Sequence, residues 1–364
     1  MAQHPYERAE TANPTSMPLC STPPKPKPQL PPAVMADLSR ARAVIATRGK
    51  WMNRTVLHYG FIKDGSHYHV PDEQVDVVRQ AFATWKALGI GLEFTEVTDL
   101  SEAEIRIGFS LADGRSASSV GTDVLQVPIN QPTTYYGWDL TSKYGRGTAL
   151  HEIGHALGLE HEHQNPFAGI KWNEQAVYTD LGGPPNRWDR GTIFSNILQK
   201  LSVNDVQGST WDPDSIMEYQ FSPGLIAEPE QYANGLVPPG ALSRSDKEWA
   251  LKWYPGETPA APRTPSLKPF ESVAIALAAG QQADFVFEPQ QSRKFTIATQ
   301  GACDTILALF EEIDGESRYL GADDDSGEDR NASIRQKLFK GRKYHLRLRV
   351  YQPGATGTTS IMVS

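Results

Sequence analysis

Three histidines recur at a spacing that suits the binding of one metal ion. The chain contains TALHEIGHALGLEH, in which His151, Glu152 and His155 begin the pattern HExxHxxGxxH. On a helix, His151 and His155 lie four residues apart and project from the same face. Gly158 permits the left-handed turn that ends the helix, and His161 then returns as a third nitrogen ligand. Three protein ligands with one open position are typical of catalytic zinc, because structural zinc sites are usually closed by four protein ligands.

The same stretch has a plainer interpretation as a buried amphipathic helix whose histidines are incidental. Its apolar residues would then only face a core: Leu150, Ile153, Ala156, Leu157 and Leu159. The added glycine and third histidine make a chance match far rarer than for HExxH alone. We therefore interpret the apolar residues as the packing that holds the ligands still.

Composition limits the classes of partner. The net charge of −8 argues against a nucleic acid or an anionic membrane surface. No apolar run approaches the roughly 18 residues of a membrane span, and no basic region followed by an apolar core marks a signal peptide. The two cysteines, Cys20 and Cys303, do not make a disulfide framework. We expect a monomer whose partner is a protein or peptide.

The chain of 364 residues is long enough for two domains with separate cores. Residues 1–48 are rich in proline, which favours extended conformation, so we expect a leader or propeptide with helical character only at 33–47. Residues 49–256 have a globular texture. Residues 257–269 form a proline-rich linker, and residues 270–364 form a second domain.

Cys20 lies in the leader, within PLCSTP. A thiolate is a good zinc ligand, so a cysteine on a flexible arm can fill the open position of the metal and keep an enzyme latent. The segment loosely resembles the cysteine switch of matrixin propeptides. The alternative is a plain exposed thiol.

Periodicity predicts the elements that surround the motif. Strands are expected at 55–60, 92–97 and 103–109. Helices are expected at about 71–88 and about 193–200. The Gly/Ser-rich stretch 116–121, with 124–129 after it, is either exposed edge structure that can pair with an extended peptide or a mobile loop.

A second motif, SIMEY, lies at residues 215–219. Taken alone, Met217 would be core filler. After a complete HExxHxxGxxH, however, the pair of motifs resembles the metzincins, zinc endopeptidases with a Met-turn beneath the metal. Glu162 and His163, directly after the third ligand, and Tyr219, two residues after Met217, resemble the astacins in particular.

This resemblance covers about residues 49–255 and implies an α+β catalytic domain with a mixed twisted sheet and an active-site helix. It implies a secreted zinc metalloendopeptidase. The residues implied for the site are the ligands His151, His155 and His161, the general base Glu152, the oxyanion donor Tyr219 and the structural Met217. Tyr219 is otherwise a buried aromatic beneath the site. The resemblance also implies that Glu162 pairs with the mature N-terminus after the leader is removed.

A non-catalytic adhesin or binding protein on the same scaffold is the alternative function. Such a protein normally carries a damaged motif, whereas His151, Glu152, His155 and His161 are all present here. We therefore favour the enzyme.

Alternating segments beyond the linker predict a small all-β sandwich. They lie at 285–287, 294–297, 306–310 and 344–350. The sequences DTIL at 304–307 and DDDSG at 323–327 resemble the bacterial pre-peptidase C-terminal domain. Its acidic cluster either binds Ca²⁺ through oxygen ligands or is a solvated turn: Asp323, Asp324, Asp325 and Glu328. We expect docking, substrate presentation or secretion support from this domain.

Overall fold

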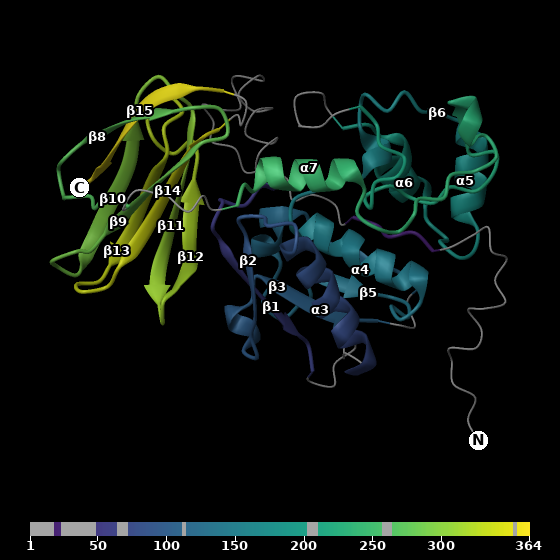
Figure 1. Ribbon diagram of the computed structural model, residues 1–364, viewed down its shortest axis with the longest axis horizontal. Helices are drawn as coiled ribbons and strands as arrows, with labels where there is room; N and C mark the ends of the chain where they lie inside the picture. Colours follow the sequence, from purple (N-terminus) through teal and green to yellow (C-terminus); the bar gives the residue numbers. More distant parts are fainter. Residues whose placement is uncertain are drawn as a thin grey trace.

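The computed structural model describes residues 18–22, 49–63, 72–110, 114–201, 210–256, 264–351 and 355–364. Within these ranges a mixed α/β part is followed by an all-β part (Figure 1). The expected helix at 33–47 and residues 257–263 of the expected linker lie outside the described residues. Among the described helices, none combines the length and the apolar character needed to cross a membrane.

The first part contains a five-stranded mixed sheet. In spatial order its strands are β2 (Glu93–Glu96), β1 (Val56–Phe61), β3 (Ile105–Phe109), β5 (Thr134–Tyr136) and β4 (Ala117–Ser118). The first four strands run parallel to one another, and β4 is antiparallel to β5 at the sheet edge. The three expected strands are confirmed.

Two helices pack together over this sheet. Helix α3 (Asp72–Lys86) buries Val78 and Trp85, as its apolar stripe predicts. Helix α4 (Lys143–Ala156), which carries the histidine motif, begins at Ser142, whose side chain accepts a hydrogen bond from Gly145 N. The indole of Trp85 donates to Leu150 O at 3.0 Å, which ties α3 to α4.

The stretch after the motif is more regular than periodicity predicts. It contains η4 (Glu162–Gln164), β6 (Lys171–Trp172), α5 (Glu174–Gly182), α6 (Arg190–Ile193) and the π-helical turn η5 (Phe194–Leu198). Helix α5 was not expected, because it buries only Val177 and Leu181 and so lacks a long apolar stripe. The helix expected at 193–200 is replaced by α6 and η5.

The remaining elements of this part complete the site. They are η2 (Leu100–Glu102), η3 (Gly121–Gln126), β7 (Ile226–Glu228), η6 (Glu230–Tyr232) and α7 (Arg244–Trp253). Strand β7 pairs with β6. Helix α7 begins with a capping box between Ser243 and Asp246. Edge structure is confirmed only at β4, since residues 121–126 form a 3₁₀ helix, and Ala117 and Ser118 are buried rather than exposed.

The second part is a sandwich of two antiparallel four-stranded sheets, as predicted. One sheet contains β13 (Ser333–Leu338), β10 (Arg293–Gln300), β15 (Gly357–Val363) and β8 (Val273–Leu277). The other contains β12 (Glu316–Asp323), β11 (Thr305–Ile313), β14 (Tyr344–Val350) and β9 (Gln282–Phe287). Leu267, inside the expected linker range, already packs in the sandwich core.

The two parts touch through polar and apolar contacts. Arg54 Nη1 lies 2.6 Å from Asp284 Oδ2 of β9. Met52 packs against Ala308 and Phe310 of β11. Sheet β12-β11-β14-β9 therefore faces the first part, on the side of strand β1.

Candidate metal centre

Helix α4 and the turn after it bring the motif side chains together. His151, Glu152 and His155 are buried on α4. Gly158 has a φ of 98°, so it makes the predicted left-handed turn. His161 follows and is 1% exposed. The motif is therefore folded as its spacing predicts.

The three imidazoles converge through their Nε2 atoms, and a fourth group joins them. His155 Nε2 lies 3.0 Å from His161 Nε2. Cys20 Sγ lies 3.1 Å from His151 Nε2, 3.4 Å from His161 Nε2 and 3.9 Å from His155 Nε2. Within the described ranges these four side chains are the one group of three or more His, Cys, Asp or Glu residues close enough to share an ion, with ligand atoms within 4.8 Å of one another.

The other ring nitrogens fix the tautomers. His151 Nδ1 lies 2.7 Å from Ile216 O, and His155 Nδ1 lies 2.8 Å from Leu159 O. His161 Nδ1 lies 3.3 Å from Gln164 Oε1. Because each Nδ1 faces an acceptor, it carries the proton, and the Nε2 lone pairs point at one another.

This donor set fits zinc. Three lone pairs and a sulfur directed at one point repel one another unless a cation lies between them. Tetrahedral zinc with bonds of about 2.05 Å to nitrogen and about 2.3 Å to sulfur separates its ligand atoms by roughly 3.3–3.6 Å. The observed separations of 3.0 to 3.9 Å bracket that range. Burial, followed by the charge of neighbouring imidazoles, lowers the pKa of His151 and His161 well below 6.5, which favours the neutral ligand form.

Glu152 is the acidic group of the site. It is 0% exposed, and neither carboxylate oxygen forms a hydrogen bond of normal geometry. Burial raises its pKa to about 8, with a smaller opposite effect from the Cys20 thiol. A divalent cation among the three imidazoles acts in the other direction and favours the carboxylate. A buried, unsatisfied carboxylate is costly in a purely structural role.

Met217 lies beneath the helix and is 1% exposed. A Cβ added to Gly154 would lie 2.5 Å from Met217 Sδ, so the methionine is packed directly against α4. Asp246 of α7 holds the turn, since its carboxylate accepts from Ser215 Oγ at 2.6 Å and from Ile216 N at 2.8 Å. Helix α7 thus fixes the turn at Ser215 and Ile216, next to Met217.

Tyr219 reaches the same point as the histidines. Its OH lies 2.7 Å from His161 Nε2 and 3.2 Å from Cys20 Sγ, and it donates to Cys20 O at 2.6 Å. Burial, followed by the nearby Cys20 and Glu152, raises the pKa of Tyr219 well above 10, so the phenol keeps its proton.

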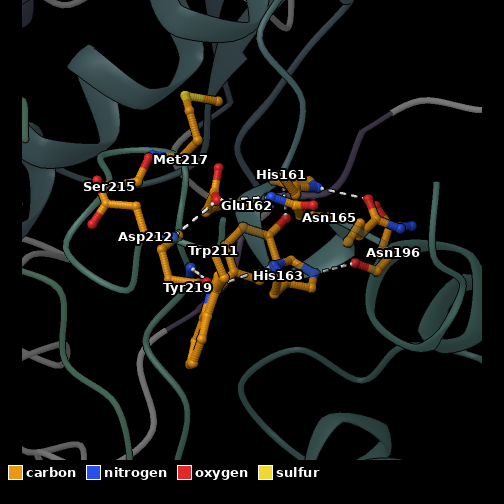
Figure 2. Close-up of polar contacts among 12 residues, drawn as sticks. His161, Glu162, His163, Asn165, Asn196, Trp211, Asp212, Ser215, Met217 and Tyr219 are labelled. Carbon is orange, nitrogen blue, oxygen red and sulfur yellow. Dashed lines mark hydrogen bonds and ion pairs between the residues drawn. The ribbon is translucent and has the colours of Figure 1, made fainter. Parts of the chain in front are cut away.

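The sequence did not indicate the buried pair next to Tyr219. His163 Nδ1 lies 3.3 Å from Glu218 Oε1, and both side chains are 0% exposed. His163 Nε2 lies 2.8 Å from Asn196 O, and Trp211 Nε1 donates to Glu218 Oε2 at 2.6 Å (Figure 2). This network joins the turn at residues 215–219 to η5.

Glu162 is largely buried beside this network. Its Oε1 accepts from Asp212 N at 3.0 Å and from Asn165 Nδ2 at 3.2 Å (Figure 2). Burial raises its pKa to about 7. The pairing of Glu162 with a mature N-terminus stays a prediction.

An apolar cavity lies next to the histidine motif. A mostly apolar cavity of about 370 Å³ adjoins His151 and is lined in part by Trp138, Tyr144, Thr148, Ile216 and Val237.

In the sandwich, Asp323 accepts hydrogen bonds from Ser326 N and Ser333 N, so this carboxylate caps a turn. The calcium site stays a prediction.

Comparisons with known proteins find metalloproteases similar to part of this chain. No protein-family model matches the chain. Metalloendoproteinase 1-MMP of Arabidopsis thaliana is 29% identical over 133 residues, or 32% of this chain and 36% of that protein. Serralysin of Photorhabdus sp. (strain Az29) is 32% identical over 126 residues, or 29% of this chain and 25% of that protein. The matched part therefore spans about a third of the first curated relative and a quarter of the second.

A solved structure of myroilysin covers more. It is 30% identical with a TM-score of 0.52, and the alignment covers 59% of this chain and 99% of that chain. The homologues are metalloproteases of the metzincin type. The chain therefore belongs to the same family of metzincin-type metalloproteases as myroilysin.

Proposed function

We propose that the chain is a zinc-dependent endopeptidase with its active site at His151, His155, His161 and Glu152. The observation that carries the proposal is the convergence of three Nε2 lone pairs beside a buried carboxylate that has no hydrogen bond. The metalloprotease homologues support the same activity. An adhesin on this scaffold has no use for such an arrangement.

The residues divide the work of peptide hydrolysis. Zinc, when bound, supplies a Lewis acid that polarises a carbonyl and lowers the pKa of a water. Glu152 accepts a proton from the attacking water and passes it to the departing amine. The OH of Tyr219, which donates to a carbonyl in this structure, donates to the oxyanion during reaction. The carbonyls of Ile216 and Leu159 hold two of the imidazoles in the ligand tautomer.

We also assign this conformation to a latent form. Cys20 is 5% exposed and lies within 3.9 Å of all three Nε2 atoms, so its thiolate would hold zinc together with the three imidazoles. While the thiolate is bound, no water occupies that position. Release of the leader opens it.

The finer assignments rest on the resemblance. Within the metzincins we assign the chain to an astacin-like group from Glu162, His163 and Tyr219, and we assign it a secreted location. The apolar cavity beside His151 takes an apolar substrate side chain. The sandwich, as a domain of the pre-peptidase C-terminal type, serves docking or substrate presentation.

The peptidase is tested by zinc analysis together with casein cleavage. We expect one zinc per chain and cleavage, after removal of the leader, that a zinc chelator abolishes. Absence of zinc, or cleavage that survives the chelator, contradicts the proposal.

The latent form is tested by cobalt substitution in the full-length chain. A thiolate bound to Co²⁺ gives a charge-transfer absorption band, which we expect in the wild type and in Cys303→Ala. The band should vanish in Cys20→Ala. A band that persists in Cys20→Ala shows that the thiol is not a ligand.

A further inference from the structure

Two asparagines hold the backbone of the leader segment 18–22, independently of its thiol. Asn186 Oδ1 accepts a hydrogen bond from Leu19 N at 2.8 Å. Asn196 Oδ1 accepts from Thr22 N at 3.0 Å and from Thr22 Oγ1 at 3.1 Å. Both asparagines belong to residues 183–199, which we call the asparagine wall.

Two residues outside the asparagine wall hold further backbone groups of this segment. Ser21 N donates to Ser116 O at 3.0 Å, next to the edge strand β4. The OH of Tyr144 on α4 donates to Pro18 O. Five backbone or side-chain hydrogen bonds therefore fix residues 18–22 without relying on the thiol.

Both asparagines of the wall are buried. Asn186 is 7% exposed and Asn196 is 5% exposed. Asn196 Nδ2 donates to Thr192 O at 3.1 Å and lies 3.3 Å from Ser195 Oγ. Because these bonds orient the amide, its Oδ1 is directed into the cleft.

The leader sequence matches this requirement for amide donors. It contains MPLCSTPPKPKP, in which Leu19 to Thr22 form a run of four consecutive residues without proline. Three of these four donate their backbone N–H to the cleft walls. Pro18 has no N–H to donate and is held through its carbonyl, which accepts from the OH of Tyr144.

We propose that the asparagine wall is a binding site for the backbone of an extended peptide, in which Asn186 and Asn196 accept two amide protons three residues apart. The leader occupies this site in the latent form. Substrates use the same site, so the cleft disfavours peptides with proline at either position. This inference rests on the proposed function only in that the same cleft hydrolyses peptides. The site itself needs no metal.

The test measures how often the leader leaves the cleft of the full-length chain. Cys20 is buried, so a thiol reagent labels it only after the leader opens, and mass spectrometry reports its labelling separately from that of Cys303. We expect Asn186→Ala to raise the labelling rate of Cys20 roughly 2- to 12-fold, as expected for one lost hydrogen bond. The double variant with Asn196→Ala should raise it roughly 10- to 100-fold. The increase should appear in both the zinc-loaded and the metal-free chain.

Matched variants keep the result interpretable. Asn186→Asp keeps the acceptor oxygen and should keep the wild-type labelling rate, and so should Gln175→Ala, which removes an exposed amide on α5. The rate at Cys303 should not change in any variant. If Cys303 labelling rises with that of Cys20, the rescue by Asn186→Asp decides, since a merely structural role gives no such rescue.

Wild-type labelling of Cys20 in the double variant overturns the proposal. So does an effect confined to the zinc-loaded chain, because the anchor would then be the thiol alone. If the chain binds no zinc, the proposed peptidase function is contradicted. The labelling rate of Cys20 in the metal-free chain still tests the asparagine wall. A proline scan adds the peptide side: Thr22→Pro should open the leader more than Thr22→Val, which keeps the N–H.

Discussion

The buried histidines of the metal centre and the buried histidine between the two parts of the molecule differ in their hydrogen-bond partners. His151 and His155 direct Nδ1 at backbone carbonyls and leave Nε2 as a lone pair. His58 on β1 is also 0% exposed, but its Nδ1 lies 3.1 Å from Glu104 Oε2 and its Nε2 lies 3.0 Å from Glu316 Oε2.

The comparison shows that the partners of the second nitrogen decide what a buried imidazole does. One carbonyl partner leaves His151 neutral and able to bind a metal, and burial lowers its pKa well below 6.5. Burial also lowers the pKa of His58, but the hydrogen bonds to Glu104 and Glu316 outweigh it and raise the pKa above 6.5. The carboxylates of Glu104 and Glu316 therefore favour the protonated form of His58, which links β1 to β12.

The largest effect is expected from His155→Ala, which breaks the neutral cluster. In the chain without its leader, where Cys20 no longer supplies a ligand, removing one of the three Nε2 lone pairs leaves only two, too few for tight zinc binding, so zinc content and casein cleavage should both fall to background. His345→Ala is the matched control, because His345 pairs with Glu312 in the sandwich at 2.8 Å. Normal zinc content in His155→Ala contradicts the ligand assignment.

Glu152→Gln separates chemistry from metal binding. The amide cannot take up a proton from water, so we expect cleavage to fall by roughly 10²- to 10⁴-fold. Zinc content should be unchanged, since Glu152 is not among the four grouped ligand residues. A variant that cleaves casein at the wild-type rate removes Glu152 as the base.

Gly154→Ala keeps every histidine but changes the packing of α4 against Met217. The new Cβ meets Met217 Sδ at 2.5 Å and Trp85 at 3.3 Å, so α4 or the turn that carries Met217 must shift. We expect a loss of about 1–3 kcal/mol in the free energy of unfolding, measured by thermal or denaturant unfolding. Gly169→Ala has open space around its Cβ but a φ of 68°, so it serves as a control for backbone strain alone. An unchanged Gly154→Ala protein shows that the methionine contact is loose.

Local spacing explains why the metal centre could be predicted and its surroundings could not. His151 and His155 share one helix turn, so their geometry follows from the sequence. Asn186 lies 167 residues from Leu19, and His58 lies 258 residues from Glu316. No local pattern reports pairings of that length, and each of these residues looks like an ordinary strand or loop residue. The proline-free window at Leu19 to Thr22 was the one available signal for the peptide site.

The strands of both parts followed from alternation, because one face of each strand is buried and the other is not. Helix α5 was missed for the opposite reason. It packs through Val177 and Leu181 alone, and its other residues are polar or partly exposed. A short helix with two buried residues leaves no periodicity to recognise.

The smallest effect concerns His58 and sharpens the comparison by pH. Because its folded pKa is raised, its contribution is complete below the ordinary value of 6.5 and is lost as pH rises through the higher folded pKa. The groups that face it are Glu104 and Glu316, with Arg318 near both Glu316 and Glu102. The contact between the two parts should therefore be tightest at acidic pH and loosen on alkalinisation.

His58→Gln should remove this pH dependence and cost about 1–2 kcal/mol in unfolding free energy near pH 6, because one charged hydrogen-bonding centre is lost while Glu316 is partly exposed to solvent. Thermal unfolding from about pH 6 to about pH 9 measures it. Glu316→Gln should weaken the pH dependence without removing it, because Glu104 still faces His58, whereas Glu312→Gln, within the sandwich, should leave the contribution of His58 unchanged. If His58→Gln keeps the wild-type pH profile, His58 is neutral in the folded chain. The two sets of buried histidines would then differ in position but not in charge.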